Sequence, residues 1–376
     1  IPRSGSHYPG IPRSKEILVL LDDQMATELT ITAPDDFHLH VRDGPMLSAV
    51  MPHTSRLFRR AIIMPNLVPP VSSIDMANSY KERITAALPA GAKFQPLMTL
   101  YLTKETTPEV IKQASAAGIT AVKWYPAGAT TNSQFGVKET ELNNLFPTFR
   151  AMAEVGMPLL CHGETTDPDA DMFDREAMWV KTVLKPLVEG VPELKVVMEH
   201  VTTTEGVEFV KSAREGVAAT MTVQHMLLNR NALFSYQGQG GLRPHHYCLP
   251  ILKRESHRRS LVEAATSGSP KFFAGTDSAP HTMDKKESSC GCAGCFTSPA
   301  ALELYAEVFE GEGKLDKLEA FTSLNGAKFY GLPTNDSKVK LTRKSWKMPP
   351  SYQVSDGAVV VPLRAGEDIE WSAQPV

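Results

Sequence analysis

The sequence predicts an α/β fold, a (β/α)8 TIM barrel with a short C-terminal extension. Two observations support this fold class. Short apolar runs rich in β-branched residues recur about eight times, and longer stretches with helical spacing separate them. Alternating strands and helices predict a parallel sheet with helical crossovers, and eight repeats favour closure of that sheet over an open doubly wound arrangement.

The predicted strands are short and apolar. In chain order they cover residues 29–33, 61–64, 93–97, 120–123, 157–161, 195–199, 218–222 and 271–274. Helical spacing with a polar face is clearest at residues 108–117, 141–155, 204–215 and 255–266. We expect these helices to connect successive strands of the barrel.

Three segments follow from this pattern. Residues 1–28 form an N-terminal leader, residues 29–332 form the barrel, and residues 333–376 form an extension packed on it, with a strand-like run at 357–362. Residues 1–15 contain Arg3, Arg13 and Lys15 but no acidic residue, which is typical of organelle transit peptides. A disordered leader is the alternative interpretation.

The composition is that of an ordinary globular protein, with 42% hydrophobic and 22% charged residues. A formal net charge of -3 without a long basic run argues against nucleic acid or membrane partners and favours a small molecule. No apolar stretch approaches the ~20 residues that span a bilayer. The five cysteines do not form a secreted disulfide pattern, so we expect a reducing compartment: the cytoplasm, or a plastid or mitochondrion if the leader is a transit remnant.

Polar side chains gather at the carboxyl ends of the predicted strands, where the active sites of barrels are built. The residues at these ends are His38, His40, Asn66, Lys123, His162, His200 and Asp277. A single histidine of this kind is as often a hydrogen-bonded core residue as a ligand. Four of them with an aspartate at one barrel mouth favour a metal site.

The residue types suit zinc. His38 and His40 flank one apolar residue, so in an extended backbone both imidazoles project to the same side. Imidazole and carboxylate are the usual ligands of zinc in hydrolytic sites, where one position stays open for water. Asp277 can serve both as a metal ligand and as the general base and acid of the reaction.

Lys123 allows two interpretations. An ammonium group cannot ligate a metal, so a lysine at this strand end is either a surface residue or chemically modified. Carboxylation of its amine by carbon dioxide would convert the cation into a carboxylate that can bridge two metals. The sequence alone does not show this modification.

Several motifs, in family order, resemble those of the dihydroorotase family in the amidohydrolase superfamily. They are DFHLHVRDG at 36–44, MPN at 64–66, VKWYPA at 122–127, CHGE at 161–164, EHVT at 199–202 and GTDSAPH at 275–281. The resemblance extends from about residue 29 to residue 332. Within the family, the sequence resembles the single-domain bacterial and plant type. The segment KESSCGCAGC at 286–295 is more diagnostic of this family than the His-X-His motif.

The resemblance implies a binuclear zinc enzyme. It assigns His38, His40, a carboxylated Lys123 and Asp277 to one metal, and Lys123, His162 and His200 to the other. The implied reaction is the reversible hydrolysis of dihydroorotate to N-carbamoyl-aspartate in pyrimidine biosynthesis, with Asp277 as the catalytic residue. The family likeness also makes a homodimer a reasonable expectation.

The implied substrate carries a carboxylate. Arg42 lies two residues after His40, on the same side of an extended strand, and its guanidinium can bind a carboxylate with two hydrogen bonds. A local ion pair with Asp43 is the alternative for Arg42. By resemblance, the remaining substrate-binding residues are Asn66, Thr130, Thr131, Leu249, His281 and Ala293. The sequence departs from the usual bacterial pattern at Gly128, where that pattern has asparagine.

Three alternatives remain open from the sequence. The chain could be another cyclic amidohydrolase, such as a hydantoinase or allantoinase, which shares the His-X-His and lysine pattern. It could be a catalytically inactive scaffold, although such relatives usually lose metal ligands. A separate zinc site could form from Cys290, Cys292 and Cys295, with Cys248 as a distant fourth ligand.

Overall fold

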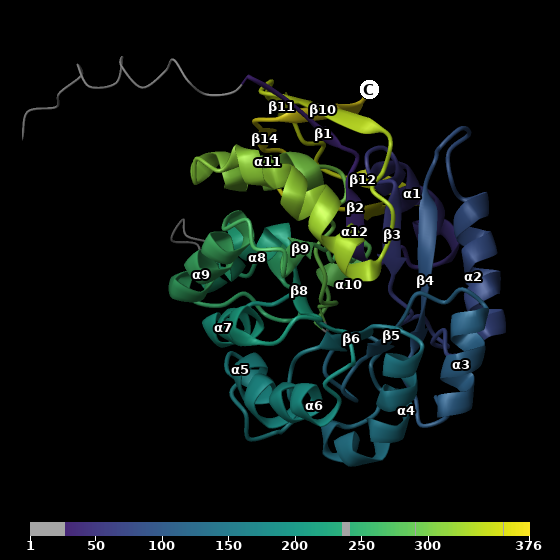
Figure 1. Ribbon diagram of the computed structural model, residues 1–376. Coiled ribbons are helices and arrows are strands. Elements are labelled where there is room, and N and C mark those ends of the chain that lie inside the picture. Colours follow the sequence, from purple (N-terminus) through teal and green to yellow (C-terminus); the bar gives the residue numbers. More distant parts are fainter. Residues whose placement is uncertain (1–26, 235–240, 290, 356) are drawn as a thin grey trace, which may run out of the picture.

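The computed structural model describes residues 27–234, 241–289, 291–355 and 357–376 (Figure 1). Its centre is an eight-stranded parallel sheet with the strands in chain order. The strands are β2 (Asp35–Leu39), β3 (Arg60–Ile63), β4 (Gln95–Tyr101), β5 (Ala121–Trp124), β6 (Leu159–His162), β7 (Val196–Glu199), β8 (Val217–Met221) and β9 (Phe272–Ala274). The predicted fold class is confirmed.

Backbone hydrogen bonds bring the last strand of the sheet back to the first. The Asp277 amide donates to the His38 carbonyl at 2.9 Å, and the His40 amide donates to the Ser278 carbonyl at 3.1 Å. These bonds join the segment after β9 to the end of β2. The residues that follow the first and the last barrel strand are therefore neighbours, although more than half of the chain separates them.

Helices surround the barrel. They are α1 (Gly44–Ser55), α2 (Ile74–Ala86), α3 (Pro108–Ala116), α4 (Leu142–Glu154), α5 (Arg175–Trp179), α6 (Lys185–Gly190), α7 (Thr204–Ser212), α8 (Val223–Leu227), α9 (Glu255–Thr266), α10 (Met283–Lys286), α11 (Ala301–Gly311) and α12 (Asn325–Tyr330). Several begin at a residue whose side chain accepts a hydrogen bond from the first turn, as at Ser73, Thr107 and Thr203. None of the described helices has the length and hydropathy required to cross a membrane.

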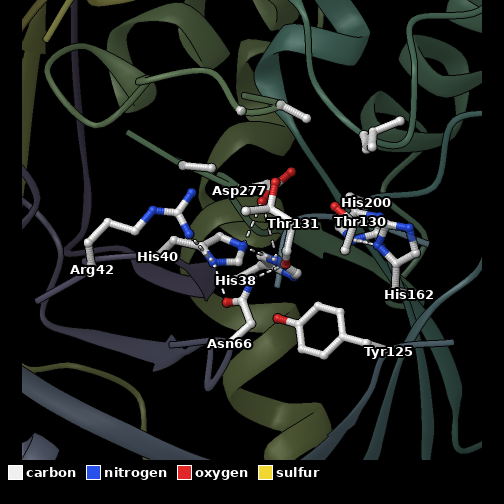
Figure 2. A pocket seen from close by; sticks show the side chains of 14 residues that line it. His38, His40, Arg42, Asn66, Tyr125, Thr130, Thr131, His162, His200 and Asp277 are labelled. Atoms are coloured by element: carbon white, nitrogen blue, oxygen red, sulfur yellow. Dashed lines mark hydrogen bonds and ion pairs between the residues drawn. The ribbon is translucent and has the colours of Figure 1, made fainter. Parts of the chain in front are cut away.

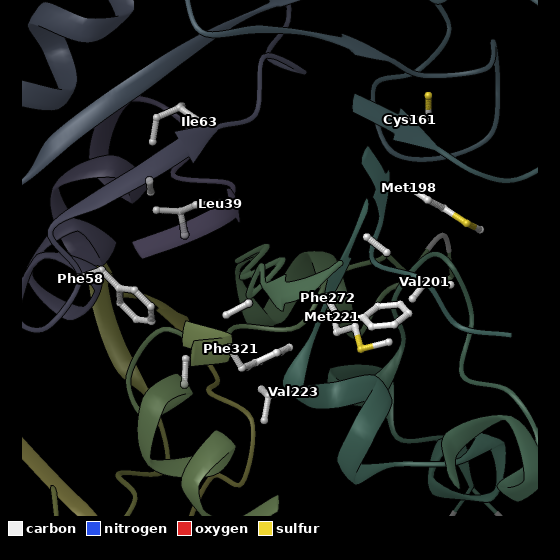
Figure 3. Close-up of a cluster of buried hydrophobic side chains, with 14 of the residues drawn as sticks. Leu39, Phe58, Ile63, Cys161, Met198, Val201, Met221, Val223, Phe272 and Phe321 are labelled. Carbon is white, nitrogen blue, oxygen red and sulfur yellow. The ribbon is translucent and has the colours of Figure 1, made fainter. Parts of the chain in front are cut away.

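The outer face of the barrel packs against these helices. Side chains such as Leu39, Ile63, Cys161 and Met198 point outward into one large buried cluster (Figure 3). Trp124 belongs to this cluster too, as its position next to Lys123 predicts, and its indole donates to the Val137 carbonyl at 2.9 Å. Burial of this apolar surface is the main stabilising contribution to the fold.

The barrel interior has two layers. The lower layer is an apolar cluster, which we call the barrel base: Phe37, Ile62, Met64, Leu97, Ala121, Leu160, Val197, Ala218, Phe273 and Ala327. On several of these strands the side chain two residues further along is polar, as in Ala121 and Lys123 or Leu160 and His162. The period of two in a strand keeps both members of such a pair on the inner face.

Strand β2 departs from this period. Its register against β3 shifts between Asp36 and Leu39, as at a β-bulge. Phe37 therefore packs in the barrel base, while His38, the next residue, lies at the site above it. Helix α12 closes the base, and Gly326 allows the close approach because a Cβ there would lie 2.2 Å from the Phe37 ring.

The prediction that residues 29–33 form the first barrel strand is wrong. Strand β1 (Glu28–Thr32) pairs antiparallel with β10 (Lys338–Thr342), which pairs with β15 (Ser372–Pro375) (Figure 1). The first barrel strand is β2, a polar segment in which two buried carboxylates have distant partners. Asp35 pairs with Arg60 at 2.5 Å, and Asp36 accepts hydrogen bonds from Thr276.

The C-terminal extension thus forms a sheet with the segment that precedes the barrel. It also contains the strand pairs β11 (Trp346–Lys347) with β14 (Asp368–Ile369), and β12 (Tyr352–Ser355) with β13 (Ala358–Val360). The strand-like run expected at 357–362 corresponds to β13. The predicted leader lies outside the described residues except for its last two, and the division of the chain at residues 28 and 332 stays a prediction.

Candidate metal centre

Three side chains from the two ends of the sheet form one compact group. His38 and His40 come from β2 and the residue after it, and Asp277 follows β9. The His38 Nε2 and His40 Nε2 atoms are 3.3 Å apart, and Asp277 Oδ1 lies 3.3 and 3.1 Å from them. All three side chains are buried, and among the described residues this group could hold a metal ion.

Two further imidazoles lie beside this group. The Nδ1 atom of His162, at the end of β6, is 3.2 Å from the Nε2 atom of His200, which follows β7. The His200 ring centroid is 4.9 Å from that of His38 (Figure 2). The four predicted histidines therefore lie together at the barrel mouth, although they are far apart in the sequence.

Lys123 is buried next to these imidazoles. Its side chain is fully inaccessible, and its Nζ atom has no hydrogen-bond partner among the described residues. Burial lowers its pKa below the ordinary value because desolvation disfavours the ammonium form. A neutral, unpartnered amine is the form that can react with carbon dioxide, so this residue fits the bridging carboxylate that the family resemblance implies.

Hydrogen bonds fix the orientation of three imidazoles. The Nδ1 atom of His38 donates to Glu199 at 2.5 Å, the Nδ1 atom of His40 to Asn66 at 2.9 Å, and the Nε2 atom of His162 to Glu164 at 2.8 Å. The opposite nitrogen of each ring faces the neighbouring imidazoles. Since a ring nitrogen that does not carry the proton is the one that ligates, these bonds leave the inward nitrogens available to a metal.

The protonation states of the site also suit a metal. Burial lowers the pKa of His40 to about 3 and that of His200 well below its ordinary value. Burial alone would raise the pKa of Asp277, but hydrogen bonds with His38 and His40 hold it well below the usual range. Neutral imidazoles at His40 and His200 beside an ionised Asp277 are the ligand forms that bind cations. Burial alone would lower the pKa of His38 too, but the Glu199 carboxylate raises it, so a metal at that ring would displace a proton.

Three residues at the mouth have left-handed backbone conformations. Their φ angles are 57° at Arg42, 40° at His200 and 44° at Asp277. Residues other than glycine rarely adopt this region, and such strain is typical of functional sites. Here the left-handed conformation occurs just after the strands. The chain turns at these positions, and the functional side chains still point into the mouth.

Arg42 points to the same centre and has no carboxylate partner among the described residues. Its Nε atom donates to the Pro280 carbonyl at 3.1 Å, and its Nη2 atom lies 3.0 Å from His281 Nε2. The expected alternative, an ion pair with Asp43, is not formed, because Asp43 pairs with Arg83 at 2.8 Å. A half-buried guanidinium with only neutral partners is suited to bind an anion.

These residues line a small pocket at the barrel mouth. Its lining contains five of the predicted metal ligands and most of the predicted substrate residues: His38, His40, Arg42, Asn66, Thr130, Thr131, His162, His200, Leu249, Asp277 and Ala293. Lys123 and His281 are not in the lining. Lys123 is buried behind the imidazoles, and His281 lies behind the Arg42 guanidinium.

Hydrogen bonds hold the loop that carries Thr130 and Thr131 against the pocket. Asn66 Nδ2 donates to the Thr131 carbonyl at 3.1 Å, and Asn132 Nδ2 donates to the Asn66 carbonyl at 3.0 Å. Gly128, where the sequence departs from the usual bacterial pattern, has a φ of 91°. This conformation favours glycine, so the substitution is compatible with the loop geometry.

Comparison with known proteins identifies the family. The chain matches the amidohydrolase family over residues 35–339. It is 57% identical to the dihydroorotase of Cupriavidus metallidurans over 350 residues, which are 93% of this chain and 100% of that protein. It is 58% identical to the mitochondrial dihydroorotase of Arabidopsis thaliana over 346 residues, 92% of this chain and 90% of the relative. The chain belongs to the dihydroorotase family.

Solved structures agree with this assignment. The crystal structure of dihydroorotase from Campylobacter jejuni has a TM-score of 0.84 at 36% identity and covers 93% of this chain and 98% of its own. An L-hydantoinase from Arthrobacter aurescens has a TM-score of 0.75 at 17% identity, a likeness that shows only the shared fold. As a member of the dihydroorotase family, the chain is a metal-dependent cyclic amide hydrolase with a small-molecule substrate, and the resemblance seen in the sequence is confirmed.

Sequence reasoning missed three residues of this dihydroorotase site. Glu164 and Glu199 lie inside the quoted motifs, but only the tertiary structure shows that they hold His162 and His38. Tyr125 lines the pocket and was quoted only as part of VKWYPA. Its position two residues after Lys123, just beyond the end of β5, is the signal that could have identified it, because alternate residues of an extended chain point to the same side. Of the cysteine cluster, Cys290 lies outside the described residues, while Cys248, Cys292 and Cys295 are free thiols.

Proposed function

We propose that this chain catalyses the reversible hydrolysis of (S)-dihydroorotate to N-carbamoyl-L-aspartate in pyrimidine biosynthesis, with two zinc ions as cofactors. A single observation carries the proposal. The buried amine of Lys123, which has no hydrogen-bond partner in the described ranges, lies next to the imidazoles, and Arg42, which has no carboxylate partner there either, faces the same pocket as the Asp277 carboxylate. This combination suits the hydrolysis of an amide in a substrate that carries a negative charge.

In this proposal the six polar side chains divide between two metal positions. His38, His40 and Asp277 would hold one cation, His162 and His200 would hold the other, and a carboxylated Lys123 would supply oxygen ligands to both. The 4.9 Å separation of the His38 and His200 rings supports two adjacent positions. When bound, zinc lowers the pKa of a water to about 7 and so supplies a nucleophile at neutral pH.

Asp277 moves the proton. Its carboxylate lies at the centre of the site, and its low pKa keeps it ionised and able to accept a proton from the attacking water. The water oxygen bonds to the amide carbon of the ring, the carbon–nitrogen bond breaks, and Asp277 returns the proton to the leaving nitrogen. Ring closure is the same sequence in reverse.

Arg42 binds the substrate carboxylate. Its guanidinium is held by Pro280 and His281 and faces the pocket, so it can offer two parallel hydrogen bonds. Asn66, Thr130, Thr131, Leu249, His281 and Ala293 complete the proposed substrate contacts. A crystal structure of the dihydroorotase from Saccharomyces cerevisiae contains 5-fluoroorotic acid, a pyrimidine with such a carboxylate, which supports this substrate class.

The loop with Thr130 and Thr131 excludes water from the reaction in this proposal. Its contacts with Asn66 lie directly beside the metal ligand His40. Removal of water strengthens the electrostatic interactions within the site and protects the intermediate from side reactions.

The test combines metal analysis with a ring-opening assay. The purified protein should contain two zinc ions per chain, should consume dihydroorotate with loss of the ultraviolet absorbance of the ring, and should lose both metal and activity to a chelator. Activity on hydantoin without activity on dihydroorotate would reverse the assignment and favour a hydantoinase. Absence of bound metal and of any turnover would instead favour an inactive scaffold.

We also propose a homodimer, which light scattering would test against a monomer.

The cellular compartment depends on residues outside the described range. The relatives include bacterial proteins and a plant protein named as mitochondrial. Fluorescence microscopy of the full-length protein, with residues 1–28 retained or removed, would decide between an organelle and the cytoplasm.

A further inference from the structure

The hydroxyl of Tyr125 is a polar group in the pocket to which neither the motifs nor the proposed mechanism assign a role. The side chain is 1% exposed and lines the pocket. Its Oη atom is buried and has no hydrogen-bond partner among the described residues. A buried hydroxyl without a partner destabilises the fold, so a group of this kind calls for an explanation.

The ring of Tyr125 is held in one position. It stacks on Tyr101 with centroids 5.1 Å apart and an interplanar angle of 28°, and the Lys123 Nζ atom lies 5.0 Å from its centroid. The Tyr101 hydroxyl in turn donates to the Asn132 carbonyl of the loop at 3.3 Å. The orientation of the Tyr125 hydroxyl is therefore fixed by its neighbours.

The hydroxyl faces the cationic end of the pocket. Figure 2 shows it directed toward Asn66 and away from His162. The Asn66 Oδ1 atom is 2.9 Å from His40 Nδ1, and Arg42 Nη1 is 3.5 Å from the same nitrogen, so Asn66 and Arg42 meet at this end. This is where the carboxylate of an anionic substrate would lie. A tyrosine hydroxyl is protonated at neutral pH and can donate a hydrogen bond to such a carboxylate.

We propose that Tyr125 is a substrate-binding residue whose hydroxyl donates a hydrogen bond to the substrate carboxylate beside Arg42. The inference rests on the proposed function, because it takes the substrate to be an anion bound by Arg42. It adds a specificity determinant. A ring amide without a carboxylate would leave the Tyr125 hydroxyl without a partner and the Arg42 guanidinium without an anion, and such a substrate is rejected by the cost of burying these groups.

The test is the variant Tyr125→Phe, measured in both directions of the reaction. Since the carboxylate is present in substrate and product and does not react, its contact contributes equally to ground state and transition state. Loss of a hydrogen bond to a charged group should raise both KM values by about 10-fold or more, with kcat nearly unchanged. Zinc content should equal that of the unsubstituted protein.

The matched control is Tyr330→Phe. The Tyr330 hydroxyl is also buried and has no hydrogen-bond partner within the described segments, but its ring stacks on Phe37 at the barrel base. Removal of this hydroxyl should leave KM, kcat and zinc content unchanged. A loss of activity in both variants would indicate a structural role of buried tyrosine hydroxyls and overturn the proposal.

Two other results would also overturn it. Unchanged KM values in Tyr125→Phe would show that the hydroxyl does not contact the substrate. A fall in kcat with unchanged KM would assign the hydroxyl to the reacting amide and not to the carboxylate. If the unsubstituted protein does not turn over dihydroorotate, the proposed function fails first, so the two failures are distinguishable.

Discussion

The mouth and the base of the barrel belong to the same sheet but have opposite chemistry. At the base, Phe37, Leu160 and Phe273 pack in an apolar cluster with aromatic stacking against Tyr330. At the mouth, further along several of these strands, buried polar atoms such as Lys123 Nζ have no hydrogen-bond partner in the part of the chain that the structure describes. The base resembles an ordinary protein core, whereas the mouth is a site prepared for ligands.

This difference separates stability from function. Apolar packing at the base stabilises the fold without a ligand. The mouth buries polar groups and strained residues such as His200 and Asp277, which cost free energy in the absence of a ligand. We therefore expect substitutions at the mouth to affect metal and substrate binding, and substitutions at the base to affect the free energy of unfolding.

The largest effect is expected for Lys123→Ala. Loss of the bridge should reduce the zinc content. It should also lower kcat/KM about 10³-fold or more, because several kcal/mol of transition-state stabilisation is lost. Lys195→Ala is the control, since Lys195 donates to the Phe329 carbonyl near the base. Metal analysis and turnover should be normal in the control. Normal turnover in Lys123→Ala would remove the bridging lysine from the proposal.

Phe37→Ala should affect the stability of the fold and leave metal and substrate binding nearly unchanged. Removal of a fully buried phenylalanine from the base should lower the free energy of unfolding by about 3–5 kcal/mol, as measured by denaturant titration. At temperatures where the variant stays folded, the KM for dihydroorotate should stay near its normal value. A normal unfolding free energy with loss of zinc would contradict the separation of the two layers.

Arg42→Met tests the mouth alone. The zinc content should not change, and the KM for dihydroorotate should rise by about 10- to 100-fold because the carboxylate loses a charged partner. Arg83→Met is the control, because its partner Asp43 is exposed and the ion pair contributes little. Unaltered substrate affinity in Arg42→Met would count against its role.

Glu199→Gln should have a smaller effect at the same end. The carboxylate orients His38, and loss of such a contact to a metal ligand typically costs about 10- to 100-fold in metal affinity or activity. Zinc affinity, measured by competition with a chelator, should fall while the unfolding free energy of the metal-free protein changes little. Normal zinc affinity in this variant would show that the Glu199 carboxylate does not orient His38 for metal binding.

The sequence predicted most strands because they are apolar and separated by helices, and it located the site residues at strand ends. It did not identify β2. The buried Asp35 and Asp36 make this segment look like a loop until Arg60 and Thr276 provide distant partners. The apolar pattern of residues 29–33 fits a strand of the barrel and a strand of the outer sheet equally well. A local pattern does not specify which strand it will pair with.

The order of the elements, the residue types at the strand ends and the family motifs were determined by the sequence alone, because period and spacing are local properties. Only the tertiary structure decided which nitrogens of His38 and His162 face inward, and that Arg42 has no acidic partner among the described residues. It also showed the isolated hydroxyl of Tyr125. The physical reason is that hydrogen bonding and desolvation depend on neighbours that are distant in the chain and meet only when the barrel closes.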